Sequence, residues 1–159
     1  MKKAQDLANR LQEVLLNGYW IANTNYKDQL LNIRLQEAVH QIESLNTIAA
    51  LTYHINYYLE GILSVFNGNP LSIKDQYSFD LPPLHSASDW DNLVERFLLN
   101  ATNFVEQVAQ MPDEKLDEVF EEEKYGTYFR NIAGVIEHSY YHLGQIVLIR
   151  KLIQKQSPM

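Results

Sequence analysis

The stretch IEHSYYHLGQI (residues 136–146) decides how this chain folds. It lies in a segment of about residues 128–154 whose apolar side chains recur at steps of three and four, the period of one face of an α-helix. Thr127, directly before this segment, is a residue type that often caps the start of a helix. We therefore predict a long amphipathic helix whose buried face holds two histidines among apolar residues: Val135, His138, His142, Ile146 and Ile149.

The same periodicity, with its flanking caps and stop signals, predicts three further long helices upstream, at about residues 3–17, 47–66 and 88–111. Residues 67–88 contain a glycine and three of the five prolines of the chain and show no clean period, so we expect an irregular crossover there. Almost no strand pattern is present. The sequence thus predicts an all-α protein, a four-helix bundle forming a single domain over residues 1–159, with the long crossover between its second and third long helices.

Composition argues against several classes of protein. The formal net charge is −7, whereas a nucleic-acid surface is built from clustered Lys and Arg. No apolar run approaches the roughly 20 residues of a membrane span, and the start of the chain lacks the apolar core of a signal peptide. We therefore expect a cytoplasmic protein that binds neither nucleic acid nor membrane. Because the chain has no cysteine, any metal ion must be held by nitrogen and oxygen ligands.

His138 and His142 are the strongest indication of chemistry. Their spacing of four places both imidazoles on one face of the helix, one turn apart, where they can bind one divalent metal ion. The same pair could instead arise by chance and be two core histidines whose nitrogens are hydrogen-bonded. A shared metal ion would, however, satisfy two imidazoles that are otherwise costly to bury.

His54 lies within or beside the apolar stripe of the helix at residues 47–66. Packed helices lie about 8–10 Å apart, so side chains from two of them can converge on one ion. Three imidazoles with an open position form a catalytic type of metal site, in which water or substrate is the remaining ligand. We predict such a site from His54, His138 and His142.

Other residues give weaker signals. His85 is expected to be exposed, and His40 forms only a single Glu-x-x-His motif with Glu37, whereas a di-iron bundle needs two. Tyr58 and Gln145 are the candidates to line a pocket; Gln145 could equally orient a ligand histidine or be an ordinary polar helix residue. Gly144 is expected to allow a close contact between helices.

Two segments resemble the DinB/YfiT superfamily of helical-bundle, metal-dependent enzymes. NTIAALTYHINYY (residues 46–58) is similar to the second helix of that family, with its single ligand histidine, and HSYYHLGQI (residues 138–146) is similar to its last helix. The order and separation of the two segments fit over nearly the whole chain.

The resemblance implies a divalent metal ion, Zn or Ni, bound by His54, His138 and His142, and a homodimer packed through helix faces. It also implies a small-molecule substrate. Characterised members include thiol-dependent S-transferases and a mycothiol-dependent isomerase, in which the metal ion activates a low-molecular-weight thiol.

Three functions remain open on the sequence alone. The first is a metal-dependent enzyme, a thiol S-transferase acting on small electrophiles. The second is a metal-dependent hydrolase, for which the sequence offers only Glu60 or Glu137 as a general base. The third is a non-catalytic bundle that binds a metal ion, ligand or partner.

Overall fold

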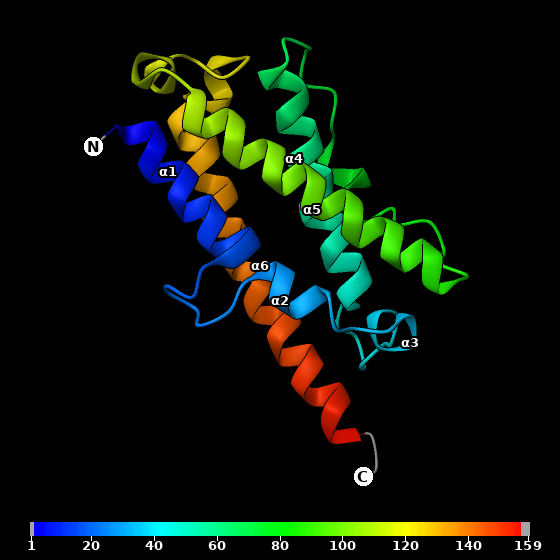
Figure 1. Ribbon diagram of the computed structural model, residues 1–159. Coiled ribbons are helices and arrows are strands. Elements are labelled where there is room, and N and C mark those ends of the chain that lie inside the picture. The colour runs from blue at the N-terminus through cyan, green and yellow to red at the C-terminus, as the bar shows by residue number, and fades with distance from the viewer. Residues whose placement is uncertain (1, 157–159) are drawn as a thin grey trace.

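The computed structural model describes residues 2–156, and its regular structure there is helical, apart from one isolated bridge between Val119 and Thr127 (Figure 1). The long elements are α1 with its π-helical continuation η1, α4, α5 and α6: Lys3–Gln12, Glu13–Asn17, Ile48–Phe66, Ala87–Gln110 and Tyr128–Gln156. The short elements are α2, α3 and three 3₁₀ turns, η2, η3 and η4: Tyr26–Leu30, Leu35–Ala38, Asp75–Tyr77, Asp113–Asp117 and Glu123–Tyr125. The prediction of an all-α protein is confirmed.

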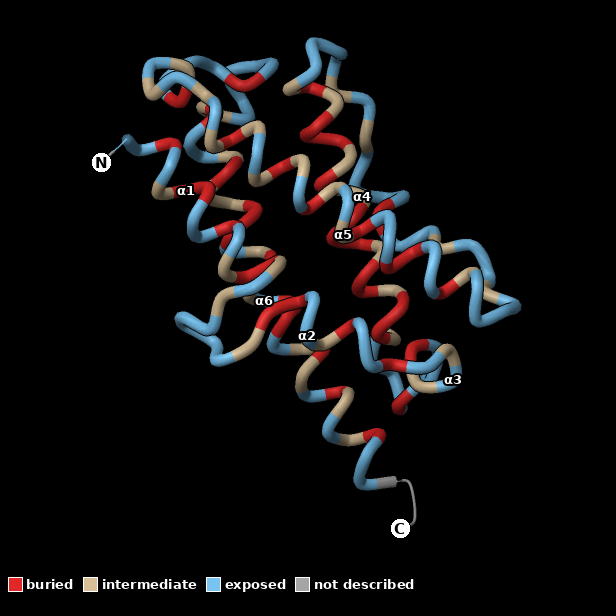
Figure 2. Tube along the Cα trace, viewed as in Figure 1, coloured by how far each residue is buried: buried red, intermediate tan, exposed pale blue. Residues whose placement is uncertain are grey.

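The long helices share one core. α5 packs against both α1 and α4, and α6 packs against α4 and, less extensively, α1. Figure 2 shows buried positions recurring along each of these helices and giving way to exposed positions on the outer faces. Large side chains fill the interior, among them Trp90, Tyr26, Phe97, Phe104 and Phe120. Their burial supplies most of the stabilisation, at about 25 cal/mol for each Å² of apolar surface removed from water.

The helix starts follow from their capping residues. The hydroxyl of Thr47 accepts from the backbone N–H of Ala50, and that of Thr127 accepts from the backbone N–H of Arg130. Each such cap stabilises a helix start by about 1 kcal/mol. α6 therefore begins where the sequence predicts. α5 begins one residue earlier than expected, because Ser86 and Asp89 form a capping box there.

The crossover between α4 and α5 folds back along α4. A Cβ atom at Gly61 would lie 2.5 Å from Cδ1 of Ile73, so the crossover can approach α4 this closely only because Gly61 has no side chain. The hydroxyl of Tyr57 donates to the carbonyl oxygen of Lys74 at 3.0 Å and accepts from its backbone N–H at 2.9 Å. These contacts hold residues 73–79 beside the middle of α4.

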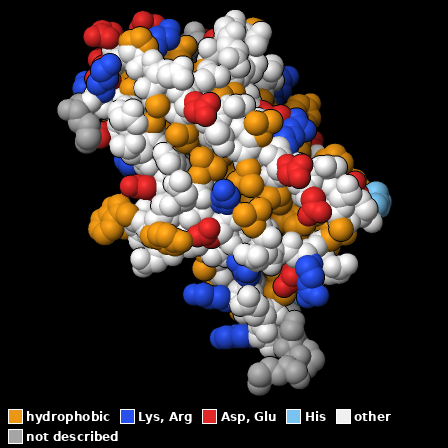
Figure 3. Space-filling view, viewed as in Figure 1, with side chains coloured by type: hydrophobic (Ala, Val, Ile, Leu, Met, Phe, Trp, Pro, Cys, Tyr) orange, Lys and Arg blue, Asp and Glu red, His pale blue; other side chains and the backbone are white. Residues whose placement is uncertain are grey.

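The surface shows two further features. Tyr19, Trp20 and Ile21 follow η1 and are largely exposed, and apolar side chains protrude at that edge in Figure 3. Acidic and basic side chains are interspersed over the face drawn there. None of the described helices combines the length and the apolar character needed to cross a membrane.

Candidate metal centre

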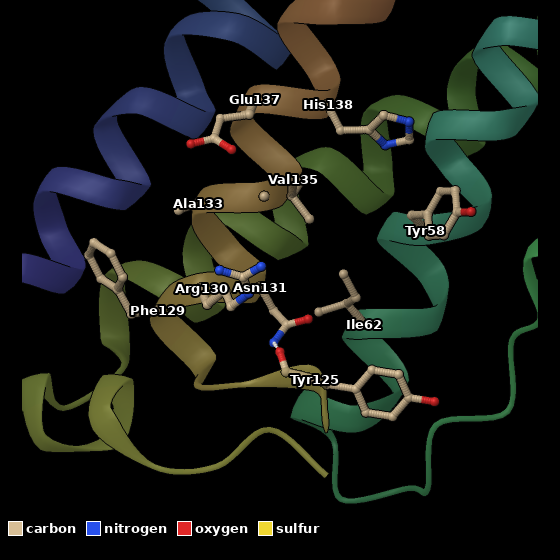
Figure 4. Close-up of a pocket in the computed structure, with 11 residues that line it drawn as sticks. Tyr58, Ile62, Tyr125, Phe129, Arg130, Asn131, Ala133, Val135, Glu137 and His138 are labelled. Atoms are coloured by element: carbon tan, nitrogen blue, oxygen red, sulfur yellow. Dashed lines mark hydrogen bonds between the residues drawn. The ribbon is translucent and has the colours of Figure 1, made fainter. Parts of the chain in front are cut away.

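Three histidines from two helices converge between α4 and α6. Nε2 of His54, on α4, lies 3.1 Å from Nε2 of His138, and Nε2 of His142 lies 2.9 Å from the same atom of His138. The rings of His54 and His142 are buried, and His138 is half-buried. Figure 4 shows the side chain of His138 directed from α6 towards α4. Among residues 2–156, these three are the one group of His, Cys, Asp or Glu side chains placed to share a metal ion.

The outer nitrogens of two rings are held by hydrogen-bond acceptors. Nδ1 of His54 lies 3.3 Å from the carbonyl oxygen of Ser78, and Nδ1 of His142 lies 2.6 Å from Oε1 of Gln145. Since both partners are acceptors, each Nδ1 carries the proton and donates it. The Nε2 atoms of His54 and His142 therefore direct lone pairs at His138.

Burial keeps the three imidazoles neutral. It is the main cause that lowers the pKa of His54 to about 4, with smaller contributions from His142 and His138, while the Ser78 carbonyl opposes the shift. Burial, together with His142, lowers the pKa of His138 to about 4. Burial also lowers the pKa of His142, against the hydrogen bond to Gln145. At pH 7 all three rings are thus in the form that ligates metal ions.

This donor set fits a divalent metal ion. A proton on Nε2 of His138 could satisfy only one of the two lone pairs that face it, so a cation between the rings resolves a conflict that hydrogen bonding cannot. Imidazole ligands at about 2.0–2.1 Å from a tetrahedral ion lie about 3.3 Å apart, close to the spacings seen here. An all-imidazole set suits Zn or Ni and leaves a coordination position open.

Aromatic side chains and the crossover enclose the centre. The ring of Phe79 stacks on His54, with centroids 4.0 Å apart. Tyr58 meets His54 and His138 edge-on at 5.1 and 5.3 Å, and its hydroxyl donates to Asp75 at 3.0 Å. The crossover therefore covers His54 through Ser78 and Phe79. Neither residue is identifiable from the sequence: Ser78 acts through its backbone carbonyl, and Phe79 lies in a segment without a period.

A pocket of about 620 Å³ opens beside the centre; it is lined mostly by residues of α6 and reaches Tyr58 and Ile62 on α4 (Figure 4). His138 and Tyr58 line it. Gln145 does not line this pocket; it borders a separate hollow of about 140 Å³ and contacts His142 instead. Of the two roles considered for Gln145, orienting a ligand histidine fits the structure.

The remaining candidates lie outside the centre. His40 and His85 are exposed, as expected for His85. Glu60 pairs with Arg96. Glu137 is exposed and borders the pocket, on the opposite side of α6 from His138 in Figure 4. Gly144 is exposed, and a Cβ atom there would meet nothing within 4 Å, so the prediction of a close helix contact at Gly144 is wrong.

Comparison with known protein families, with characterised proteins and with solved structures gives no match to this chain. The class of the protein is therefore defined by its structure alone: it is an all-helical protein with a three-histidine cluster that can hold a metal ion. The DinB-like assignment stays a prediction from the two histidine segments.

Gln145 provides a test of how the centre is oriented. Replacing Gln145 with Leu removes the acceptor of His142 Nδ1–H, and we expect zinc affinity to fall about 10–100-fold. Gln145→Glu keeps an acceptor oxygen and should bind zinc within about threefold of the unmodified protein. Competition with a chromophoric chelator measures both constants. Equal affinity in all three proteins would show that Gln145 does not orient His142.

Proposed function

We propose that the protein is a divalent-metal-dependent enzyme, a thiol-dependent S-transferase acting on small electrophiles. The convergence of three neutral imidazoles, one of which (His138) lines a substrate-sized pocket, carries the proposal. His54, His138 and His142 would hold the metal ion, with Zn or Ni the expected metals. A pocket of about 620 Å³ lies within the range of about 300–1,000 Å³ common for small-molecule sites.

When bound, the metal ion supplies Lewis acidity, which lowers the pKa of a thiol or water molecule at the open position. The residues of the chain have other roles. Ser78 keeps Nε2 of His54 unprotonated, and Gln145 does the same for His142. Phe79 shields His54 from solvent. Tyr58 forms a wall shared by the centre and the pocket.

A thiol substrate is favoured over water for two reasons. The resemblance to the DinB/YfiT superfamily points to thiol chemistry, and the absence of cysteine means that the sulfur would come from a cosubstrate. Hydrolysis lacks a general base beside the histidines: Glu60 is paired with Arg96, and Glu137, although it borders the pocket, extends from the side of α6 opposite to His138.

The finer features of the fold belong to the same proposal. We infer that α1, α4, α5 and α6 form a DinB-like four-helix bundle, because each packs against two of the others around a common core. We also infer a homodimer. The exposed Tyr19, Trp20 and Ile21 support an association surface.

Turnover with a panel of thiols tests this function. Zinc- or nickel-loaded protein should add a low-molecular-weight thiol to an epoxide: the sulfur bonds to a ring carbon, the carbon–oxygen bond opens, and the proton of the thiol ends on the oxygen. His54→Ala protein, exposed to the same metal, should show no rate above the uncatalysed reaction. Turnover that needs no thiol would indicate a hydrolase instead. Metal-loaded protein that converts no electrophile with any thiol would contradict the transferase proposal and leave the metal centre standing.

A further inference from the structure

The pocket beside the metal centre has two chemically different ends. His138 and Tyr58 lie at one end, and Tyr125, Arg130 and Asn131 lie at the other (Figure 4). Among the described residues that line this pocket, Arg130 is the only Lys or Arg, and Glu137 is the only carboxylate.

The guanidinium of Arg130 has open hydrogen-bonding capacity. Within residues 2–156 it forms no hydrogen bond or ion pair, in contrast to Arg34, Arg96 and Arg150, whose side chains are bonded. Its aliphatic stem packs over Gly126, where a Cβ atom would lie 2.7 Å from Cδ of Arg130. The chain thus leaves room for the stem and presents five N–H donors at the pocket.

The neighbouring Asn131 cannot take over this role through its amide hydrogens. Its Nδ2 already donates to the carbonyl oxygens of Tyr125 and Thr127, at 3.0 and 2.8 Å. Asn131 therefore fixes the turn before α6, and among the described residues that line this end of the pocket the cationic donors belong to Arg130.

The floor between the two ends is apolar and open. Ile62, Ala133 and Val135 line it, and a Cβ atom at Gly134 would meet nothing within 4 Å. Arg130 and His138 are eight residues apart on α6, which separates their backbones by about 12 Å along the helix axis. A ligand that reaches both must be elongated, with an apolar or neutral middle.

We propose that Arg130 binds the carboxylate of an elongated acidic substrate whose opposite end, a thiol, lies beside His138. The inference rests on the proposed function and specifies the substrate class for the same site. A guanidinium recognises a carboxylate through two parallel, charge-assisted hydrogen bonds, which is the pairing that the free donors of Arg130 allow. The carboxylate would set the orientation of the ligand and bring its sulfur to the histidine end.

Two probes that differ only in charge test this assignment. On zinc-loaded protein, calorimetric titration should show 8-mercaptooctanoate binding about tenfold more tightly than 8-mercapto-1-octanol. Arg130→Met should remove this preference, because it weakens the binding of the acid and not that of the alcohol. Arg130→Lys should restore part of the preference. Arg10→Met, which removes another exposed arginine, should leave both probes unaffected. The affinity for the short acid 3-mercaptopropionate should not depend on Arg130, because this molecule cannot span the pocket.

A second titration, on metal-free protein, separates this inference from the proposed function. Octanoate should bind the metal-free protein more tightly than 1-octanol does, and Arg130→Met should abolish the difference. If no metal ion binds, the proposed function fails, while this titration still decides whether Arg130 recognises a carboxylate. Equal binding of acid and alcohol, or a preference for the acid that survives in Arg130→Met, would overturn the inference.

Discussion

Replacing His138 with alanine should weaken the binding of a divalent metal ion by about a hundredfold to a thousandfold. His138 is the middle ligand, since its Nε2 lies within 3.1 Å of the corresponding atom of both His54 and His142. Without it, only one imidazole from each of two helices remains. The fold should survive, because the change also removes the lone-pair conflict of the metal-free centre.

The weaker metal binding of His138→Ala can be measured by thermal unfolding or by titration. A ligand at a hundredfold excess over its Kd stabilises a protein by about 2.7 kcal/mol. For a chain of this size that corresponds to a rise in Tm of roughly 5–10 °C. Zinc should raise the Tm of the unmodified protein and of His85→Ala, whose histidine is exposed on the crossover, but not that of His138→Ala. An equal rise in all three would place the metal ion elsewhere.

Replacing Gly134 with leucine should abolish ligand binding while leaving the metal centre intact. Gly134 lines the pocket, and the space where its side chain would project is open, so a leucine there fills the volume that a substrate needs. Affinity for 8-mercaptooctanoate should fall by about a hundredfold or more, because a bulky side chain in a binding pocket excludes the ligand by steric clash. Zinc content should not change.

Gly144 provides the matched control for this substitution. It lies on the same helix, a Cβ atom there also meets nothing within 4 Å, and it does not line the pocket. Either replacement should stabilise α6 slightly, because leucine is a better helix former than glycine by about 0.5–1 kcal/mol. Gly144→Leu should therefore bind ligand normally. If Gly134→Leu binds as tightly as Gly144→Leu, this pocket is not the substrate site.

The helical period was sufficient to predict the parts of the centre that lie on helices. Apolar residues at steps of three and four place His138 and His142 on the buried side of α6, and the same rule places His54 on α4. Those faces meet because α4 packs against α6. Thr47 and Thr127 mark the helix starts because their hydroxyl groups cap free N–H groups.

The surroundings of the centre could not be predicted in this way. Ser78 acts through a carbonyl oxygen, which every residue possesses, so its side chain gives no signal. Its position depends on how closely the crossover approaches α4, and that is set by the contact between Gly61 and Ile73, which the periodicity of the sequence does not reveal. At Gly144 the sequence predicted a close helix contact that the structure does not have, since a glycine in a helix need not mark a contact.

The metal content of protein purified without an affinity tag or metal resin tests the central claim most directly. Elemental analysis should find about one divalent metal ion per chain in the unmodified protein, and almost none in His138→Ala protein prepared in parallel, because the three imidazoles form a single shared site. Unmodified protein that carries no metal and takes none up on dialysis against zinc, or metal content that persists in His138→Ala, would contradict a metal centre at His54, His138 and His142.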